Sequence, residues 1–312
     1  LEPVGRTVKE VAELAQKDSM APVRVKNGAG WTGEIEAAWL RPVVKSPKEI
    51  RTLEVRLEDL CYLVFMPPED VRAAIDQRQA PPLSRYPKAR AYIQWGEKQG
   101  YHERPTCKSR QWWWDLGMQE PFDFIVLRFR HERNWTPINP NPFLLAGNIM
   151  FVGSWHVRHN VAMNNVLANT TLAALISELF GRINLGEGLL TTYGPEIVRF
   201  ITVSPDHSKP LTKRLLSAFS RLSRRPIRSI FEELGFTLCR EKKCPHPEHP
   251  YEHVDPSALT LEQVKSASPD RFELDSVVFD VLGLTDEERL QVYRAVAQLV
   301  KNRLVKAKSV RR

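Results

Sequence analysis

The sequence lacks the features that mark several large classes of protein. No apolar run approaches the roughly 18 residues that a membrane-spanning helix needs, and Leu1-Glu2-Pro3 does not begin a signal peptide. Four cysteines in 312 residues are too few for a disulfide framework. We therefore expect a chain with no membrane partner that works in the reducing cytoplasm.

Acidic residues are scarce beside basic ones. Lys and Arg number 45 against 37 Asp and Glu, which gives a formal net charge of +8. Between His207 and Phe231 there is no acidic residue at all. A helix with this imbalance repels itself unless DNA phosphates or an acidic patch of the protein neutralise it. The cations of this stretch that we expect to contact phosphates are Lys213, Arg214, Arg221, Arg224, Arg225 and Arg228.

Residues 92–114 interleave cations with aromatic rings. Guanidinium and ammonium groups neutralise phosphate while flat rings stack on bases, so this mixture is typical of a nucleic-acid surface. A packed aromatic cluster is the alternative that the residues alone leave open. The side chains that we expect to contact DNA here are Arg104, Lys108, Arg110, Trp112 and Trp114.

The order of residues in this stretch resembles the segment that opens the target-recognition region of adenine-specific DNA methyltransferases of the modification or restriction–modification type. The matching positions are Gly96-Glu97, Gly100-Tyr101, Arg104, Thr106-Cys107, Arg110, Trp113 and Leu116. Further matches follow the same order at residues 33–45, 148–152, 172–182, 186–188, 196–198 and 274–304. Because Trp113 matches the family's aromatic position, we expect it to be the buried member of the three tryptophans.

The resemblance implies a parent enzyme that flips an adenine out of double-stranded DNA and methylates it from S-adenosylmethionine. Two family motifs are missing here, the Gly-rich donor loop and the Asn-Pro-Pro-aromatic tetrapeptide. In the nearest stretch, residues 139–143, Asn141 separates the two prolines. The chain also begins at Leu1 without Met. We therefore expect no catalytic residue and no cofactor in this chain, and an upstream methyltransferase domain that binds S-adenosylmethionine in the parent protein.

The expected fold class is α+β, a mixed sheet-and-helix target-recognition module followed by a mainly helical C-terminal segment. We expect a connector at residues 1–30, the recognition module at 31–205 and a basic helical segment with a Pro/His-rich loop at 206–312. Apolar patterns predict strands near residues 35–44, 60–66, 124–129, 149–152 and 197–203. They predict helices near residues 68–75, 86–98, 169–180 and 211–231, the last interrupted at Pro226, and a final helix capped by Thr285 and Glu288.

Direct reading of bases requires Arg or similar side chains on loops that enter the major groove. Beyond residues 92–114, the candidates are Arg128, Arg130 and Arg158. Two thiols and three imidazoles between residues 239 and 253 are suitable zinc ligands, although the Cys spacing is wide and the prolines stiffen the loop. The predicted set for a structural zinc ion is Cys239, Cys244, His246 and His249, with a Pro-rich loop bearing free thiols as the alternative.

Three functions therefore stay open at the level of sequence. The first is the specificity part of an adenine methyltransferase, acting on double-stranded DNA. The second is a stand-alone DNA-binding protein or specificity subunit. The third is a zinc-stabilised interaction module with no nucleic-acid role.

Overall fold

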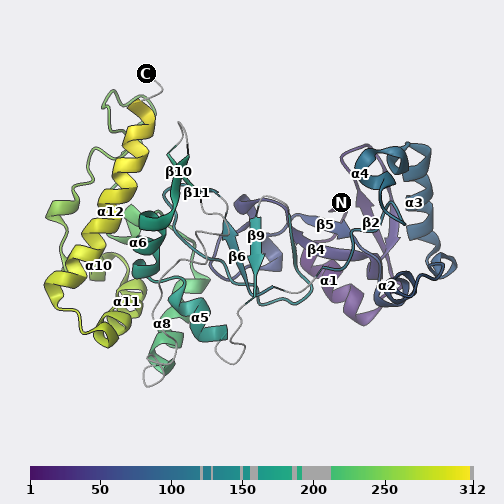
Figure 1. Cartoon of the computed structure of the whole chain (residues 1–312), viewed down its shortest axis with the longest axis horizontal. Coiled ribbons are helices and arrows are strands. Elements are labelled where there is room, and N and C mark those ends of the chain that lie inside the picture. Colours follow the sequence, from purple (N-terminus) through teal and green to yellow (C-terminus); the bar gives the residue numbers. More distant parts are fainter. Residues whose placement is uncertain are drawn as a thin grey trace. The chain divides into compact units, whose positions relative to one another are not determined.

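The chain has an α+β fold built from two compact units (Figure 1). The computed structural model describes residues 1–119, 122–127, 129–147, 150–154, 161–184, 188–191 and 212–309. Unit 1 comprises Leu1–Ile50, Val55–Phe122 and Asn141–Asn148, and unit 2 comprises Arg51–Glu54, Asp123–Pro140 and Ile149–Arg312. None of the helices in the described part of the chain combines the length and the apolar character that crossing a bilayer requires.

Unit 1 contains two small sheets. The first is antiparallel, with strand order β1, β2, β3, and Val23 and Val25 of β2 point inward because alternate residues of a strand share a face. In the second, β4 pairs antiparallel with β5 and parallel with β8. The strands are β1 (Glu2–Pro3), β2 (Pro22–Lys26), β3 (Thr32–Glu36), β4 (Leu40–Val44), β5 (Tyr62–Phe65) and β8 (Leu145–Ala146).

The helices of unit 1 are α1 (Val8–Lys17), α2 (Glu69–Asp76), α3 (Pro87–Lys98) and α4 (Pro105–Lys108). The first of them begins with a capping box between Thr7 and Glu10. Helix α3 packs against β3. The carboxylate of Glu36, at the end of β3, accepts the backbone N–H groups of Lys88 and Ala89, both at 2.8 Å. This buried acid therefore caps α3 and fixes the helix to the sheet.

In the residues that the structure describes, unit 2 joins two small sheets to a group of helices. Strand β6 (Phe124–Leu127) pairs antiparallel with β9 (Met150–Gly153), and the other sheet has the order β10, β11, β7. Those strands are β7 (Phe129–Arg130), β10 (Arg182–Asn184) and β11 (Leu189–Thr191). The helices are α5 (Val161–Leu167), α6 (Thr171–Phe180), α8 (Thr212–Arg224), α9 (Ile230–Glu233), α10 (Leu261–Ala267), α11 (Pro269–Leu282) and α12 (Asp286–Ser309).

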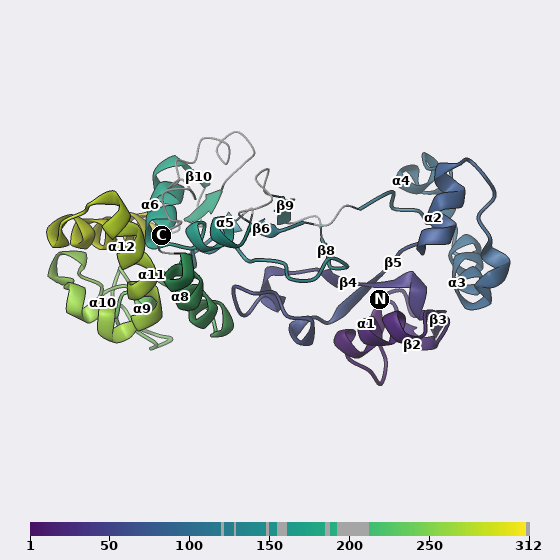
Figure 2. The same cartoon turned by 90° about the horizontal axis from the view of Figure 1, so that it is seen from below.

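Helices α9 to α12 gather around one apolar core (Figure 2). Its centre holds the fully buried rings of Phe231, Tyr251, Phe279 and Tyr293. The core also includes Ala174 of α6, with Leu172 and Leu175 packed against it. The last helix is capped as expected, because the Thr285 backbone N–H and hydroxyl both donate to Glu288 at 2.8 Å.

The α+β class is confirmed, and so are the expected helices α2, α3 and α6. The helix expected over residues 211–231 is broken near Pro226 into α8 and α9. The strand expected at residues 35–44 is interrupted by a short 3-10 helix, Ala37–Trp39, between β3 and β4. The strand expected at residues 197–203 lies outside the described residues.

Residues 1–30, which we expected to be a connector, fold into β1, α1 and β2. The reason is visible in their pattern, because Val8 and Val11 share one helical face and Val23 and Val25 share one strand face, and all four are buried. The two compact units also interleave along the chain, so their bounds differ from the expected segments 31–205 and 206–312.

A buried ionic network centred on Glu233 holds α8, α9 and α11 together. Arg225, just after α8, donates to both Glu233 carboxylate oxygens at 2.7 and 2.6 Å and to Asp270 of α11 at 2.6 Å. Arg271 of α11 donates to Glu233 at 3.1 Å, and Arg228 lies 3.5 Å from it. Burial alone would raise the pKa of Glu233, but the surrounding guanidinium groups outweigh it and hold the pKa well below its ordinary value.

We predict that Glu233→Gln lowers the free energy of unfolding by about 3–5 kcal/mol at neutral pH, because it removes the buried counter-charge that Arg225, Arg228 and the buried Arg271 share. A carboxylate whose pKa is lowered by folding stabilises above its unfolded pKa, and this contribution is lost as pH falls. The difference between the wild type and the variant should therefore shrink as pH falls below 4.5, the ordinary pKa of Glu.

Denaturant unfolding at several pH values measures this difference. Glu273→Gln is the matched control because Glu273 pairs with Arg221 at the surface, and its removal should cost less than about 1 kcal/mol. Equal costs for the two variants at neutral pH would contradict the central role of Glu233.

Candidate nucleic-acid interface and metal centre

Several aromatic residues of unit 1 form a connected cluster around Tyr92 of α3. The Tyr92 ring lies 4.5 Å from the ring of Trp31, 5.2 Å from Phe65 and 5.6 Å from Trp95, which it stacks at 11°. The ring of Tyr101 stands edge-on to Trp95 at 5.6 Å. Trp31 has no part in the expected site, and only its isolated position in a Gly-rich turn preceding β3 could have drawn attention to it.

The three consecutive tryptophans lie in a turn, and the structure corrects their expected roles. Trp114 is the buried one, with 6% of its surface exposed, and it packs edge-on against Trp39 at 5.5 Å. It is therefore part of the core of unit 1 and not a DNA contact. Trp113 and Trp112 are half-buried. A turn does not alternate faces as a strand does, so the position in the family pattern did not predict which ring points inward.

Trp113 lies against the backbone of α3 at Gly96. A Cβ atom on Gly96 would overlap the ring of Trp113, so the close approach requires glycine within the helix. The indole nitrogen of Trp113 donates to Glu97 at 3.4 Å. The Gly-Glu pair in α3 therefore has a physical reason, since it seats the ring and binds the ring's one polar atom.

A cavity of about 330 Å³ opens between α3 and the turn that carries the tryptophans. Its lining includes Tyr92, Trp95, Tyr101, Arg110 and Trp113. The exposed Arg104 lies over the face of Tyr101, with its guanidinium carbon 4.3 Å from the ring centre. Lys108 and Arg110 are exposed as well, and Arg110 donates to the Asp115 carbonyl at 3.2 Å. The expected cations thus lie at and around an aromatic cavity.

The cations of the α8 segment divide into two groups. Arg214 and Arg221 lie on one face and pair with Glu273 at the surface, while Arg225 and Arg228 belong to the buried network around Glu233. Arg228 also donates to the Ala267 carbonyl at 3.1 Å. The acidic partners come from α9 and α11. For these four residues, the protein therefore supplies the acidic patch that the sequence analysis gave as the alternative to DNA phosphates.

Lys213 and Arg224 differ from the other cations of α8. Both are exposed and have no acidic partner among residues the structure describes. They lie about three turns apart on the same face of the helix. These two side chains are the ones in α8 whose charge is available to a phosphate.

Arg130 is buried rather than placed on a surface, which corrects its expected role as a base reader. Its side chain is 4% exposed and donates to Asn134 at 2.9 Å and Ser177 at 3.0 Å. Burial lowers its pKa to about 10. The other two expected readers, Arg128 and Arg158, lie outside the described residues.

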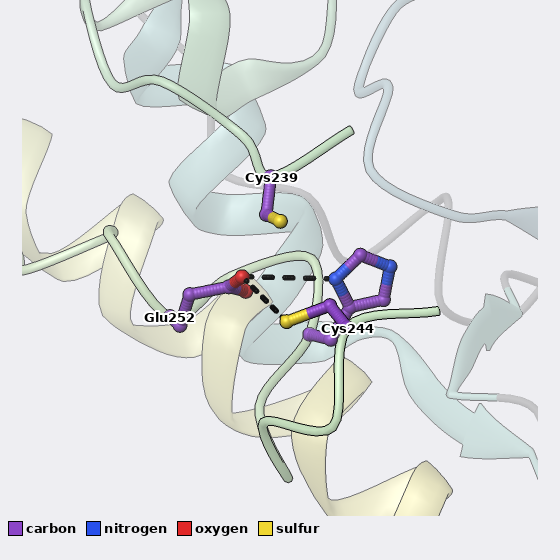
Figure 3. Close-up of side chains that lie close together, drawn as sticks. Cys239, Cys244 and Glu252 are labelled. Atoms are coloured by element: carbon purple, nitrogen blue, oxygen red, sulfur yellow. Dashed lines mark hydrogen bonds and ion pairs between the residues drawn. The ribbon is translucent and has the colours of Figure 1, made fainter. Parts of the chain in front are cut away.

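Cys239, Cys244 and His249 come together with Glu252 in the loop after α9 (Figure 3). One ligand atom from each of the four lies within 4.8 Å of all the others. The Cys244 thiol donates to Glu252 at 3.3 Å, and the pKa of Cys239 is raised to about 11, chiefly because its thiol faces the same carboxylate.

The expected ligand His246 is not part of this group, which corrects the predicted set. It is exposed, and its Nδ1 accepts the backbone N–H of Glu248 at 3.1 Å. Glu252 takes its place. The signal that could have identified Glu252 is its spacing, three residues after His249, which brings both side chains to one side of a turn.

From the packing of the tryptophans, we predict that Trp114→Ala lowers the free energy of unfolding by about 3–5 kcal/mol, the usual cost of deleting a core aromatic ring. Trp113→Ala should cost less, because that ring keeps part of its surface in water. Chemical denaturation of both variants measures the two values. A larger effect of Trp113→Ala would restore Trp113 as the core residue.

Comparison with known proteins identifies a family for this chain. A family model described as the C-terminal domain of the type II methyltransferase M.Eco57I matches residues 70–232. No curated protein and no solved structure matches the chain. The matched segment begins in α2 and ends in α9, and it includes most of the residues that line the aromatic cavity, together with Arg104, Lys108, Arg110 and α8. Because the match spans just over half of the sequence, the chain belongs to the family of the C-terminal domain of the type II methyltransferase M.Eco57I.

Proposed function

We propose that this chain is the DNA target-recognition part of an adenine-specific methyltransferase of the restriction–modification type. In this proposal, the S-adenosylmethionine site and the adenine pocket belong to the methyltransferase domain of the parent enzyme. The observation that carries the proposal is the set of exposed cations, Arg104, Lys108 and Arg110, around an aromatic cavity lined mostly by residues of the family segment.

The chemistry of this surface suits a polyanion with aromatic bases. Each exposed guanidinium or ammonium group can neutralise a phosphate and release its counter-ion. The rings of Trp95 and Tyr101 line an open cavity, where an unpaired or displaced base could stack. Arg110 is the residue best placed to read a base, because it lines the cavity and its fork of N–H donors matches the acceptors of guanine.

A second point of attachment to DNA comes from α8, through Lys213 and Arg224. Their charges have no described acidic partner, whereas Arg214, Arg221, Arg225 and Arg228 are neutralised within the protein. We expect Lys213 and Arg224 to contribute affinity and salt dependence but no sequence reading, since a bond to phosphate carries no information about the base.

We predict that replacing Arg104, Lys108 and Arg110 together by Ala weakens binding of this chain to double-stranded DNA. The slope of log K against log salt concentration should fall in magnitude by about 0.9 for each phosphate that the variant no longer neutralises. Fluorescence anisotropy with a labelled duplex at several salt concentrations measures both quantities.

The matched control replaces Lys9, Lys26 and Arg56 by Ala. Their side chains are 44%, 54% and 47% exposed and also lie in unit 1, but each is paired with a carboxylate, so the same charge is removed elsewhere. The control should keep most of the slope. If the slope fell equally in both triple variants, DNA binding would depend only on the net charge of the protein. This result would contradict an interface at the aromatic cavity.

For α8, we predict that Lys213→Ala with Arg224→Ala lowers the salt slope and leaves the free energy of unfolding unchanged within about 0.5 kcal/mol. Arg225→Ala should instead destabilise the fold by about 3–5 kcal/mol, because Glu233 and Asp270 lose their shared partner. Salt titrations and denaturant unfolding separate the two effects. An unchanged slope in the double variant would assign Lys213 and Arg224 to a solvated face.

A further inference from the structure

The cluster of Cys239, Cys244, His249 and Glu252 is not used by the proposed DNA interface. Figure 3 shows the side chains of Cys239, Cys244 and Glu252 pointing toward one another from separate parts of one loop. Around a tetrahedral zinc ion, the usual bond lengths place neighbouring ligand atoms roughly 3.3–3.8 Å apart. The distance from Cys244 Sγ to Glu252 Oε1 is 3.3 Å, and that from His249 Nδ1 to the same oxygen is 3.7 Å.

The polar atoms at this place lack the partners that burial requires. The Glu252 side chain is 7% exposed, and its second oxygen, Oε2, has no hydrogen-bond partner within the described chain. His249 Nδ1 is buried without a hydrogen bond as well. Among the residues that the structure describes, Glu252 has one ion-pair partner, His249, and an imidazole is charged only when protonated. A buried carboxylate without a cation is costly, so the cluster is suited to receive one.

The backbone of the loop presets the positions of the donors. The Cys239 N–H donates to the Pro250 carbonyl at 2.9 Å, which closes the loop beside the cluster. The His249 N–H donates to the His246 carbonyl at 3.0 Å and forms a turn. Tyr251, between His249 and Glu252, is buried in the core and donates its hydroxyl to Glu132 at 3.2 Å.

We propose that Cys239, Cys244, His249 and Glu252 bind one Zn²⁺ ion in a closed tetrahedral site. Two thiolates and an imidazole favour zinc over Ca²⁺ or Mg²⁺, which prefer oxygen ligands throughout. Four protein ligands leave no position for a substrate, so the ion has a structural role. The inference does not depend on the proposed DNA interface.

The ion would stabilise the packing of this loop against α12. Lys301 of α12 donates to the Val254 carbonyl at 2.8 Å and pairs with Glu248 at 2.7 Å. Val254 and Tyr251 belong to the same apolar core as Tyr293 and Val300 of α12. A metal that fixes residues 239–252 would therefore fix one wall of the core of unit 2.

The test begins with the full 312-residue chain, purified under reducing conditions without a chelator. Elemental analysis should find one zinc ion per chain, and removal by a chelator should lower the Tm. Adding Zn²⁺ alone should restore the Tm. Replacing zinc with Co²⁺ should give the absorption band of thiolate-to-cobalt charge transfer. A chain that holds no zinc and shows no such band with Co²⁺ would overturn the proposal.

Matched variants locate the ion. Removing a residue that only hydrogen-bonds to a metal ligand typically weakens metal binding by about 10–100-fold. Because His249 is proposed as a ligand itself, His249→Ala should weaken zinc binding by at least about 100-fold. His246→Ala should leave zinc binding unchanged. Cys239→Ser with Cys244→Ser should abolish the cobalt band, and Cys61→Ser with Cys107→Ser should retain it. If the first double variant does not fold, the histidine pair still decides. Equal weakening by His246→Ala and His249→Ala, or a band that depends on Cys61 and Cys107, would refute this site.

Discussion

The fold of unit 2 depends on how one buried carboxylate, Glu233, is neutralised. Glu233 is 3% exposed and is bound by Arg225, Arg228 and Arg271, while Asp270 shares Arg225. These residues come from α9, α11 and the segment after α8, so none of the helices can shift without separating opposite charges in a medium of low dielectric constant. Burial of apolar surface is non-directional, whereas each of these ion pairs joins two specific side chains. The ionic network therefore supplies the register of the helices, and the apolar core that includes Phe231 and Tyr293 supplies the burial.

The same network decides which cations of α8 can meet DNA. In the sequence, Arg225 and Arg228 cannot be distinguished from Lys213 and Arg224, because the acidic partners lie more than thirty residues further on, at Asp270, or in the next helix. The stretch contains no acidic residue of its own, but acids from other segments neutralise most of its cations in the folded protein. Only the three-dimensional arrangement shows that α11 places its carboxylates beside Arg221 and Arg225.

A structural feature could be predicted from the sequence when the residues that produce it lie close together along the chain. Helices with a local cap or an apolar stripe, such as α6 after Thr170 and α12 after Thr285, were predictable because the signals lie within a few residues. The role of Trp114 was not, since its burial depends on Trp39, which is distant in the chain. Glu252 was missed for a related reason. Cysteine and histidine attract attention as ligands, but a glutamate becomes one only through its position beside them.

Buried arginines limit what net charge can say about partners. Arg303 of α12 is 1% exposed in its side chain and pairs with Glu178, and it also donates to the carbonyl of His131 at 2.8 Å. Arg130 and Arg271 are likewise enclosed. These cations contribute to the formal charge of +8 as much as Arg104 or Lys108 do, yet they hold the fold together. A DNA surface must therefore be argued from exposure and partners residue by residue, and by that criterion the cations around the aromatic cavity are the stronger candidates.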